Sequence, residues 1–305
     1  MPPILDRLRA RASDARFALD VLRKSGMVRA FRPTALPGFV AAARLTKPGP
    51  HLATLLHARM HPDKECVVDG DRRYTWRAFD QAVNQLAHAI AARGGAAAPV
   101  ACMLGNGADY LIAQQALARV GAVVVQIGYR SKPAEVAYIL GNAEPAAAIV
   151  GAAYADTFAE AMRQAGSRCQ VIVAGADGAP AVGERWDDAV AGQPGDLPPT
   201  ARSGDGGGVI VYTSGTTGKP KGATRSWKQT GFDAVADMVA QVGMNHDDRH
   251  LVVCPLYHSA APAFVAITMS LGATTVLMNH FDPEACLALI ERERITSTLM
   301  VPTML

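Results

Sequence analysis

Closely spaced cysteines are absent from the 305-residue sequence. Its five cysteines are odd in number, lie far apart and form no CxxC pair: Cys66, Cys102, Cys169, Cys254 and Cys286. Disulfide frameworks and zinc sites need paired cysteines, so this pattern argues against both and favours a reducing compartment. The first residues also lack the apolar core of a signal peptide, because arginines interrupt every apolar run. We therefore expect a cytoplasmic protein.

Acidic side chains are scarce at the start of the chain. Residues 1–50 carry ten basic and three acidic side chains, a net charge of +7, and are expected to form a basic N-terminal extension. Nucleic acid is disfavoured as a partner, because the basic residues are not interleaved with aromatics that could stack on bases. Two interpretations stay open. The extension attaches peripherally to an anionic membrane surface, at its inner face, or it is a solvated helix lying on the domain.

Charged residues are also absent from Ser259 to Asn279, a stretch about long enough to span a bilayer. Pro262 and Gly272 interrupt this stretch, and its second part, residues 273–278, is rich in the β-branched residues typical of strands. We predict a buried helix followed by a buried strand.

From residue 65 onward, strand patterns alternate with helical patterns. Residues 69–71 predict a hairpin between strands at 66–68 and 73–75. Further strands are expected at 100–104, 122–127, 146–150, 170–174, 209–213, 251–254 and 297–301. Helices are expected at 76–93, 108–120, 131–140, 155–165, 184–191 and 282–294, and one more helix begins at Ser226. Ser131 would cap the helix at 131–140, and Gln229 would complete a capping box with Ser226. Repeated βα units imply an α/β fold of helix-covered parallel sheets. The Gly- and Pro-rich residues 174–208 are expected to form an internal linker.

The segment Tyr212 to Gly222 carries the clearest chemical signal. It follows a predicted strand and combines hydroxyls, lysines and glycines: Thr213, Ser214, Gly215, Thr216, Thr217, Gly218, Lys219, Lys221 and Gly222. Glycines allow close backbone approach, and N–H groups, hydroxyls and ammonium groups together can wrap a polyphosphate. The segment is not a Walker A loop, because Thr213 stands where that pattern needs glycine and Pro220 follows the lysine.

Residue for residue, this segment resembles the phosphate-binding signature of the adenylate-forming (AMP-binding) superfamily, which includes acyl-CoA synthetases, peptide-synthetase adenylation domains and firefly luciferase. Residues 74–76 with 84–87, and residues 121–125, also resemble family elements, whereas Ala98-Pro99 replaces a family-typical Gly-Asp. The resemblance covers about residues 52–305. It implies that residues 51–305 form an AMP-binding N-terminal domain, and that this domain is incomplete.

Residues 255–260 resemble the Pro-Leu-Tyr-His-Ser element of fatty-acid transport proteins and of long-chain or very-long-chain acyl-CoA synthetases. The resemblance implies that His258 orients the substrate carboxylate. A lone histidine is more often a surface or core residue, so that alternative stays open. Tyr257 and Ala260 either line an acyl pocket or serve ordinary packing.

The family reaction implies the substrates ATP, a fatty acid and coenzyme A. The carboxylate would attack the α-phosphate to give an acyl-adenylate and pyrophosphate, and the thiol of CoA would then displace AMP. Residues 213–222 would hold the phosphates, with Thr216 and Thr217 indirect partners of Mg²⁺. The family's magnesium-binding Glu, its ribose-binding Asp and its C-terminal lysine are expected beyond Leu305, so a truncated chain with impaired activity is predicted. The alternatives are an acyl-AMP ligase that loads a carrier protein, and a non-catalytic nucleotide-binding or membrane-associated remnant.

Overall fold

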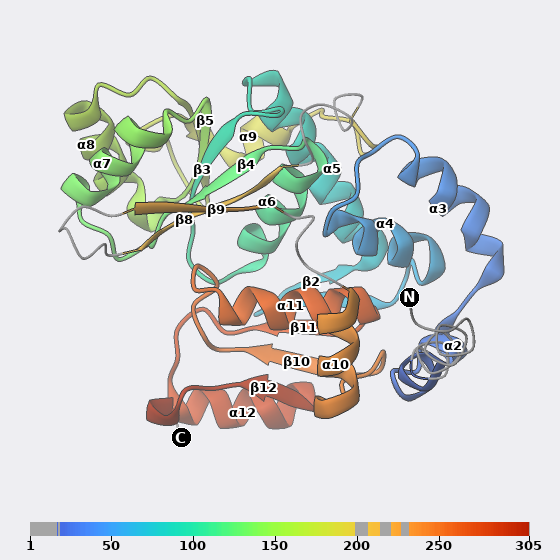
Figure 1. The fold of residues 1–305 in the computed structure, drawn as a ribbon. Coiled ribbons are helices and arrows are strands. Elements are labelled where there is room, and N and C mark those ends of the chain that lie inside the picture. Colours follow the sequence, from blue (N-terminus) through green and yellow to red (C-terminus); the bar gives the residue numbers. More distant parts are fainter. Residues whose placement is uncertain (1–16, 18, 199–206, 214–220, 227–231, 305) are drawn as a thin grey trace, which may run out of the picture.

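The computed structural model describes residues 17, 19–198, 207–213, 221–226 and 232–304. Within these ranges the chain forms two sheets with helices between and outside them (Figure 1). The larger sheet has the strand order β7-β6-β5-β3-β4-β8-β9, and its neighbours are parallel except β8 and β9. Its strands are β3 (Pro99–Met103), β4 (Val123–Gln126), β5 (Ala147–Gly151), β6 (Gln170–Ala174), β7 (Glu184–Arg185), β8 (Gly208–Thr213) and β9 (Lys221–Ser226).

The smaller sheet joins the beginning and the end of the described chain. Its order is β12-β10-β11-β1-β2, with β1 parallel to β11 and antiparallel to β2. The strands are β1 (Glu65–Asp69), β2 (Arg72–Thr75), β10 (Arg249–Val252), β11 (Thr274–Leu277) and β12 (Ser297–Leu299). The predicted hairpin at residues 66–75 is confirmed. Its first strand is inserted beside a strand about 200 residues later in the sequence.

Helices cover both faces of the larger sheet. α7 and α8 lie on one face, and α5 and α6 on the other. The helices of the described ranges are α2 (Met27–Ala30), α3 (Leu36–Ala43), α4 (His51–Met60), α5 (Trp76–Ala92), α6 (Ala108–Arg119), α7 (Pro133–Ala143), α8 (Ala155–Ala165), α9 (Trp186–Val190), α10 (Phe232–Val242), α11 (Ala260–Leu271) and α12 (Pro283–Glu293). Thr75 caps α5 by accepting a hydrogen bond from the N–H of Ala78. The predicted apolar face of α5 is fully buried, as periodicity indicates.

The main core lies between the two sheets. Val67 and Val68 of β1 and Val100 and Cys102 of β3 belong to one buried cluster, together with α5 and α6. A second cluster fills the opposite face of the larger sheet under α7 and α8. The fold class predicted from alternating βα units, helix-covered parallel sheets, is thus confirmed.

Residues 259–279 form the predicted helix and strand. α11 ends at Leu271 with Gly272 as its C-cap, and β11 follows at Thr274 with all four of its residues buried. No helix in the described ranges has the length and apolar character needed to cross a bilayer.

Three local predictions are corrected. Ser226 is the last residue of β9 rather than a helix cap, and the next helix begins at Phe232; Gln229 lies outside the described residues. The helix expected from Ser131 begins at Pro133 and is capped at Lys132, because Glu135 reaches back to the Lys132 N–H at 2.8 Å. Within residues 184–191 a two-residue strand precedes the short helix α9.

Candidate active site

The predicted phosphate-binding segment begins at the carboxyl end of β8. Val211 of β8 lies opposite Gln126 of β4, and Thr213 lies opposite Lys221 of β9. The two ends of the segment therefore face each other at the edge where the parallel strands of the larger sheet end. Open α/β sheets bind their ligands at this edge. The predicted residues between these ends lie outside the described residues: Ser214, Gly215, Thr216, Thr217, Gly218 and Lys219.

Gly222 has a structural role in this hairpin. It lies opposite Tyr212 in the antiparallel pair. A Cβ at position 222 would come within 3.1 Å of Ile210 Cγ2 and 3.3 Å of the Tyr212 ring. The Tyr212 hydroxyl in turn donates to Oδ1 of Asn142 on α7 at 2.7 Å. The missing side chain thus lets β9 lie close to β8 while Tyr212 ties the hairpin to α7.

The loop that carries His258 follows β10 of the smaller sheet. The N–H of His258 donates to the carbonyl of Pro255 at 3.1 Å, and the imidazole is exposed. The neighbouring Tyr257 ring lies 4.2 Å from the His258 ring and 5.1 Å, edge-on, from the ring of Tyr129. Tyr129 comes three residues after β4, so this aromatic contact joins the His258 loop to the strand beside β8.

Two side chains that sequence reasoning missed fix the backbone of this loop. Asn106, just beyond β3, donates from Nδ2 to the carbonyls of Cys254 at 3.1 Å and Met278 at 3.3 Å, and its Oδ1 accepts from the N–H of Leu256 at 2.9 Å. Tyr110 of α6 donates its hydroxyl to the carbonyl of Leu256 at 2.7 Å. Burial raises the pKa of Tyr110 well above its ordinary value, so the phenol stays a hydrogen-bond donor. Their only sequence signal is their position after a buried strand.

A small apolar cavity of about 80 Å³ lies beside the same loop. It is lined by Pro50, Tyr110, Leu111, Gln114, Gln115, Leu256, Pro262, Val265, Ala266 and Met269. The predicted pocket residues do not line it. Tyr257 packs on Tyr129 instead, and Ala260 is exposed at the first position of α11. His258 does not line it either.

A more polar cavity of about 300 Å³ lies at the carboxyl ends of β3, β5 and β6, between the two sheets. Its lining includes Asn106, Tyr154 and Asn279. Nearby, the Arg130 guanidinium lies 5.6 Å from the centre of the Tyr129 ring and is exposed at the same edge. Described residues thus supply hydrogen-bonding groups and one cation around the loop. Within the described ranges, no three His, Cys, Asp or Glu side chains are grouped to hold a metal ion.

Comparison with known proteins identifies the family. Residues 56–305 match the AMP-binding enzyme family. The chain belongs to this family. The match runs from the second half of α4 to the end of the chain, and therefore includes both the β8–β9 hairpin and the His258 loop.

Among curated AMP-binding relatives, the chain is 32% identical to a feruloyl-CoA synthase of Amycolatopsis sp over 249 residues, 81% of this chain and 47% of that protein. It is 32% identical to an indoleacetate–CoA ligase of Aromatoleum aromaticum over 266 residues, 82% of this chain and 49% of the relative. It is 34% identical to a 4-chlorobenzoate–CoA ligase of a Pseudomonas species, over 68% of this chain and 38% of the relative. The chain therefore spans about half the length of the curated relatives it matches.

Solved structures agree on the fold. The N-terminal domain of FACL13 from Mycobacterium tuberculosis superposes with a TM-score of 0.72 at 25% identity, covering 85% of this chain and 64% of that one. MbtA of Mycobacterium smegmatis superposes with a TM-score of 0.72 at 27% identity, covering 92% and 54%. The predicted N-terminal portion of the adenylate-forming fold is thus confirmed.

Proposed function

We propose that this chain forms the ATP- and acid-binding part of an acid–CoA ligase that activates a fatty acid. One observation carries the proposal: the segment that combines hydroxyls, lysines and glycines begins at the carboxyl end of β8, and the His258 loop packs beside the neighbouring strand β4 through Tyr129. A polyphosphate held by the first would lie near an acid held by the second.

The proposed chemistry has two balanced steps. A carboxylate oxygen of the acid bonds to the α-phosphorus of ATP, and the bond to the β-phosphate breaks, releasing pyrophosphate. The sulfur of CoA then bonds to the acyl carbon, and the bond to AMP breaks. Negative charge gathers on the phosphates in the first step, so electrostatic stabilisation is the main demand on the protein.

The residues would divide this work. Lys219 and Lys221 would balance the charge of the departing pyrophosphate, and the hydroxyls of Thr213, Ser214, Thr216 and Thr217 would donate to its oxygens. His258 would hold the acid's carboxylate in line with the α-phosphorus. Mg²⁺ would neutralise the triphosphate, and the hydroxyl oxygens of Thr216 and Thr217 are hard donors that suit it through bridging water.

The choice of a fatty acid rests on two features. Residues 255–259 resemble the element found in fatty-acid transport proteins and long-chain synthetases, and the cavity beside them is apolar. The names of the three relatives, however, refer to aromatic acids. The assay must therefore compare a series of fatty acids with ferulate and 4-chlorobenzoate.

The test is acid-dependent exchange of pyrophosphate into ATP by the purified chain. We expect slow exchange with fatty acids, in keeping with the impaired activity predicted from the sequence, a further loss in Lys221→Ala, and little change in the exposed Lys24→Ala control. If the chain does not exchange, direct ATP binding is measured on the same variants. ATP binding that is equal in Lys221→Ala and in the parent chain would contradict the phosphate-site assignment. Exchange with aromatic acids alone would contradict the fatty-acid assignment.

We place the reaction in the cytoplasm, with CoA as the acceptor. All five cysteines are free and buried, and burial raises the pKa of Cys102 to about 12, which supports a role for them as protonated core residues. The named curated relatives are CoA ligases, which supports CoA over a carrier protein. Thioester formation that needs a carrier protein and ignores CoA would contradict this acceptor.

A further inference from the structure

Exposed apolar side chains are concentrated in one segment of the structure. Among the described residues, eleven large hydrophobic side chains are exposed, and eight of these lie between residues 17 and 45. The eight are 38–55% exposed: Phe17, Leu19, Leu22, Val28, Phe31, Leu36, Val40 and Leu45. We call residues 17–47 the N-terminal face. Single exposed apolar residues are ordinary, but a concentration of this kind marks a surface that binds something.

The same face carries a positive charge. It holds six basic side chains (Arg23, Lys24, Arg29, Arg32, Arg44 and Lys47) and one acid, Asp20, a net charge of +5. Lys24 pairs with Asp20, and Arg29 pairs with Asp247 of the body. Arg23, Arg32 and Arg44 are exposed and make no ion pair with any described carboxylate. Three cations thus remain available beside the apolar side chains.

Other side chains fasten the N-terminal face to the protein. Val21 is buried in a cluster with Val239 of α10 and Leu271 of α11. The carbonyl of Ser25 accepts from the N–H of His246 at 2.8 Å, and the carbonyl of Gly38 accepts from Nε of Arg59 at 3.1 Å. The segment therefore has an inner side that packs on the body, and the eight exposed apolar residues are not needed for that packing.

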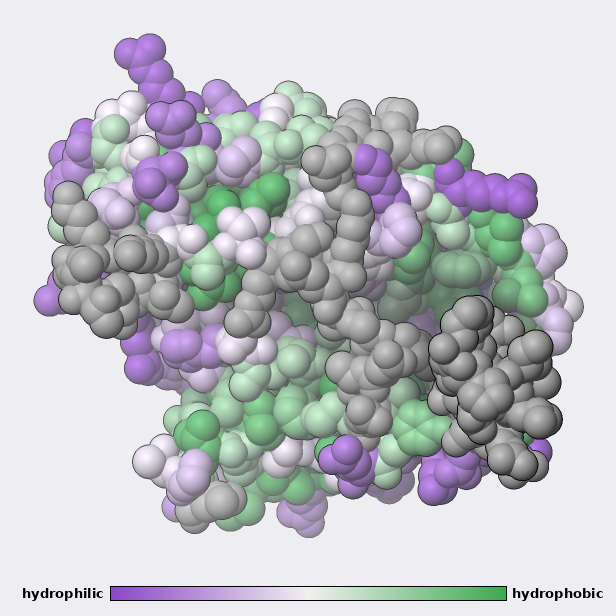
Figure 2. Space-filling view, viewed as in Figure 1, coloured by the Kyte–Doolittle hydropathy of each residue, from purple (hydrophilic) through white to green (hydrophobic). Residues whose placement is uncertain are grey.

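The face lies along one flank of the molecule. In Figure 1 its ribbon runs along the right-hand side, from α2 up to α3. Figure 2 shows hydrophobic surface next to strongly hydrophilic surface on the flank where α3 lies. A flank of this kind can approach an extended partner without covering the carboxyl edge of the larger sheet.

We propose that the N-terminal face docks the protein on the surface of a bilayer that contains anionic lipids. The charge of the N-terminal face favours a lipid surface as the partner. Its net charge of +5 complements phosphate headgroups, and the apolar side chains between the arginines would reach the boundary of the acyl chains. A second copy of the chain fits less well, because it would bring a second +5 face against the first. The proposal is independent of which acid the active site accepts.

The test is flotation of the full chain with vesicles of phosphatidylcholine alone or with one quarter phosphatidylglycerol. We expect binding to the anionic vesicles only, weakening as salt rises. The triple variant Arg23→Gln/Arg32→Gln/Arg44→Gln should bind about 100-fold more weakly, roughly fivefold per arginine. The triple variant Val28→Ser/Phe31→Ser/Leu45→Ser should keep a salt-sensitive encounter but lose the binding that persists at high salt.

Matched controls lie elsewhere on the surface. Arg77→Gln/Arg163→Gln/Arg168→Gln removes three exposed arginines, and Leu287→Ser removes an apolar side chain that is 69% exposed. Both should bind vesicles like the parent, and all variants should unfold at the parent's temperature. Equal weakening by the controls, or no preference for anionic vesicles, would overturn the proposal. So would a dimer in solution that the apolar variant dissociates while vesicle binding is absent.

Discussion

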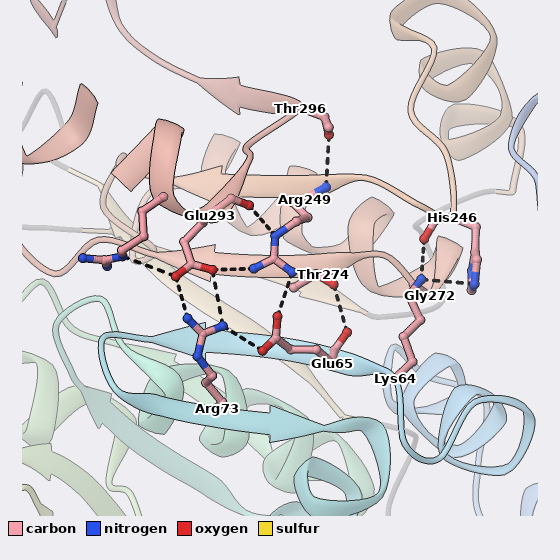
Figure 3. Close-up of polar contacts among 10 residues, drawn as sticks. Lys64, Glu65, Arg73, His246, Arg249, Gly272, Thr274, Glu293 and Thr296 are labelled. Atoms are coloured by element: carbon pink, nitrogen blue, oxygen red, sulfur yellow. Dashed lines mark hydrogen bonds and ion pairs between the residues drawn. The ribbon is translucent and has the colours of Figure 1, made fainter. Parts of the chain in front are cut away.

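Arg249 donates from Nη2 to Oε2 of Glu293 at 2.6 Å and from Nη1 to Oε2 of Glu65 at 2.7 Å (Figure 3). Arg73 closes the ring, at 2.6 Å from Glu293 and 2.9 Å from Glu65. Two arginines and two carboxylates therefore alternate across β2, β1, β10 and the end of α12. The ring connects the β1–β2 hairpin to β10 and α12, which follow it by some 180 residues or more. The Glu293 side chain within the ring is only 4% exposed.

Replacing Glu293 should destabilise the fold. In Glu293→Ala both arginines lose a buried partner, so we expect the free energy of unfolding to fall by about 2–3 kcal/mol. The exposed neighbour Glu291→Ala on the same helix should change it by less than about 0.5 kcal/mol. Urea denaturation at pH 7 measures both. A loss no larger than that of the control would show that the ring adds nothing to stability.

The Glu293 carboxylate should also make the free energy of unfolding depend on pH in the acidic range. Burial alone would raise the pKa of Glu293, but hydrogen bonds from Arg73 and Arg249 outweigh it and hold the pKa below its ordinary value. The stabilisation is present above the unfolded-state pKa of about 4.3 and is lost as the pH falls through the lowered folded value. The stabilities of the parent and Glu293→Gln should therefore begin to converge as the pH falls below about 4. Parallel curves down to pH 3 would contradict this.

Replacing Asn106 should affect the candidate active site more than the packing of the core. Asn106→Ala removes all three hydrogen bonds to Cys254, Leu256 and Met278, and we expect a loss of about 1–3 kcal/mol in unfolding free energy. The released His258 loop should also weaken use of the acid, seen as a higher KM for the acid with an unchanged KM for ATP. Gln164→Ala on the exposed side of α8 is the control. An equal rise in both KM values would indicate general damage instead.

The sequence predicts the elements of this fold far better than their long-range pairing. Apolar periodicity places α5 well, because this helix buries one face and the spacing of its apolar residues indicates which face that is. No local sequence pattern predicts that β1 pairs with β11, since the pairing depends on contacts such as that between Val67 and Thr275, about 200 residues apart. Ser226 misleads for a related reason: its local capping signal is overridden by pairing with Gly208 in the larger sheet.

The residues of the candidate site also fall into two groups, those that a local motif indicates and those that depend on long-range contacts. The phosphate-binding segment and His258 can be predicted from sequence because their motifs are contiguous. The sequence does not indicate Asn106, Tyr110 and Tyr129, because each acts through a backbone or ring contact with the His258 loop, some 130–150 residues away. A polar residue just after a buried parallel strand is the general signal that would have marked Asn106.

Gly272 offers a test of local packing. It ends α11 with a φ of +70°, and a Cβ there would lie 2.5 Å from the ring of His57. Gly166 ends α8 with a φ of +63° and has open space around it. Gly166→Ala should cost about 1–2 kcal/mol from backbone conformation alone, whereas Gly272→Ala should cost about 1–3 kcal/mol more. Equal losses in thermal or urea unfolding would rule out the contact as a constraint.

Three histidines beside α11 should make the protein sensitive to mild acid. His61 lies 4.8 Å from His246 and 6.1 Å from His57, ring to ring, and Lys64 Nζ lies 3.1 Å from Nε2 of His246. Burial, reinforced by the neighbouring charges, lowers the pKa of His57 and His61 to about 4. In the unfolded chain these rings take up protons near pH 6.5, whereas the folded cluster does not until about pH 4.

Stability should therefore be nearly constant between about pH 7 and pH 8 and fall as the pH drops from 6.5 towards 4, by up to about 1.4 kcal/mol per pH unit for each histidine. We expect the double variant His57→Gln/His61→Gln to make this slope shallower without abolishing it, since burial also lowers the pKa of His51, His246 and His250. Glutamine at 57 can still donate to the carbonyl that His57 contacts on Ser270. The exposed His280→Gln variant should leave the slope unchanged. Urea unfolding at pH 8, 7, 6 and 5 measures it, and a slope in the double variant as steep as in the parent would show that other groups cause the acid sensitivity.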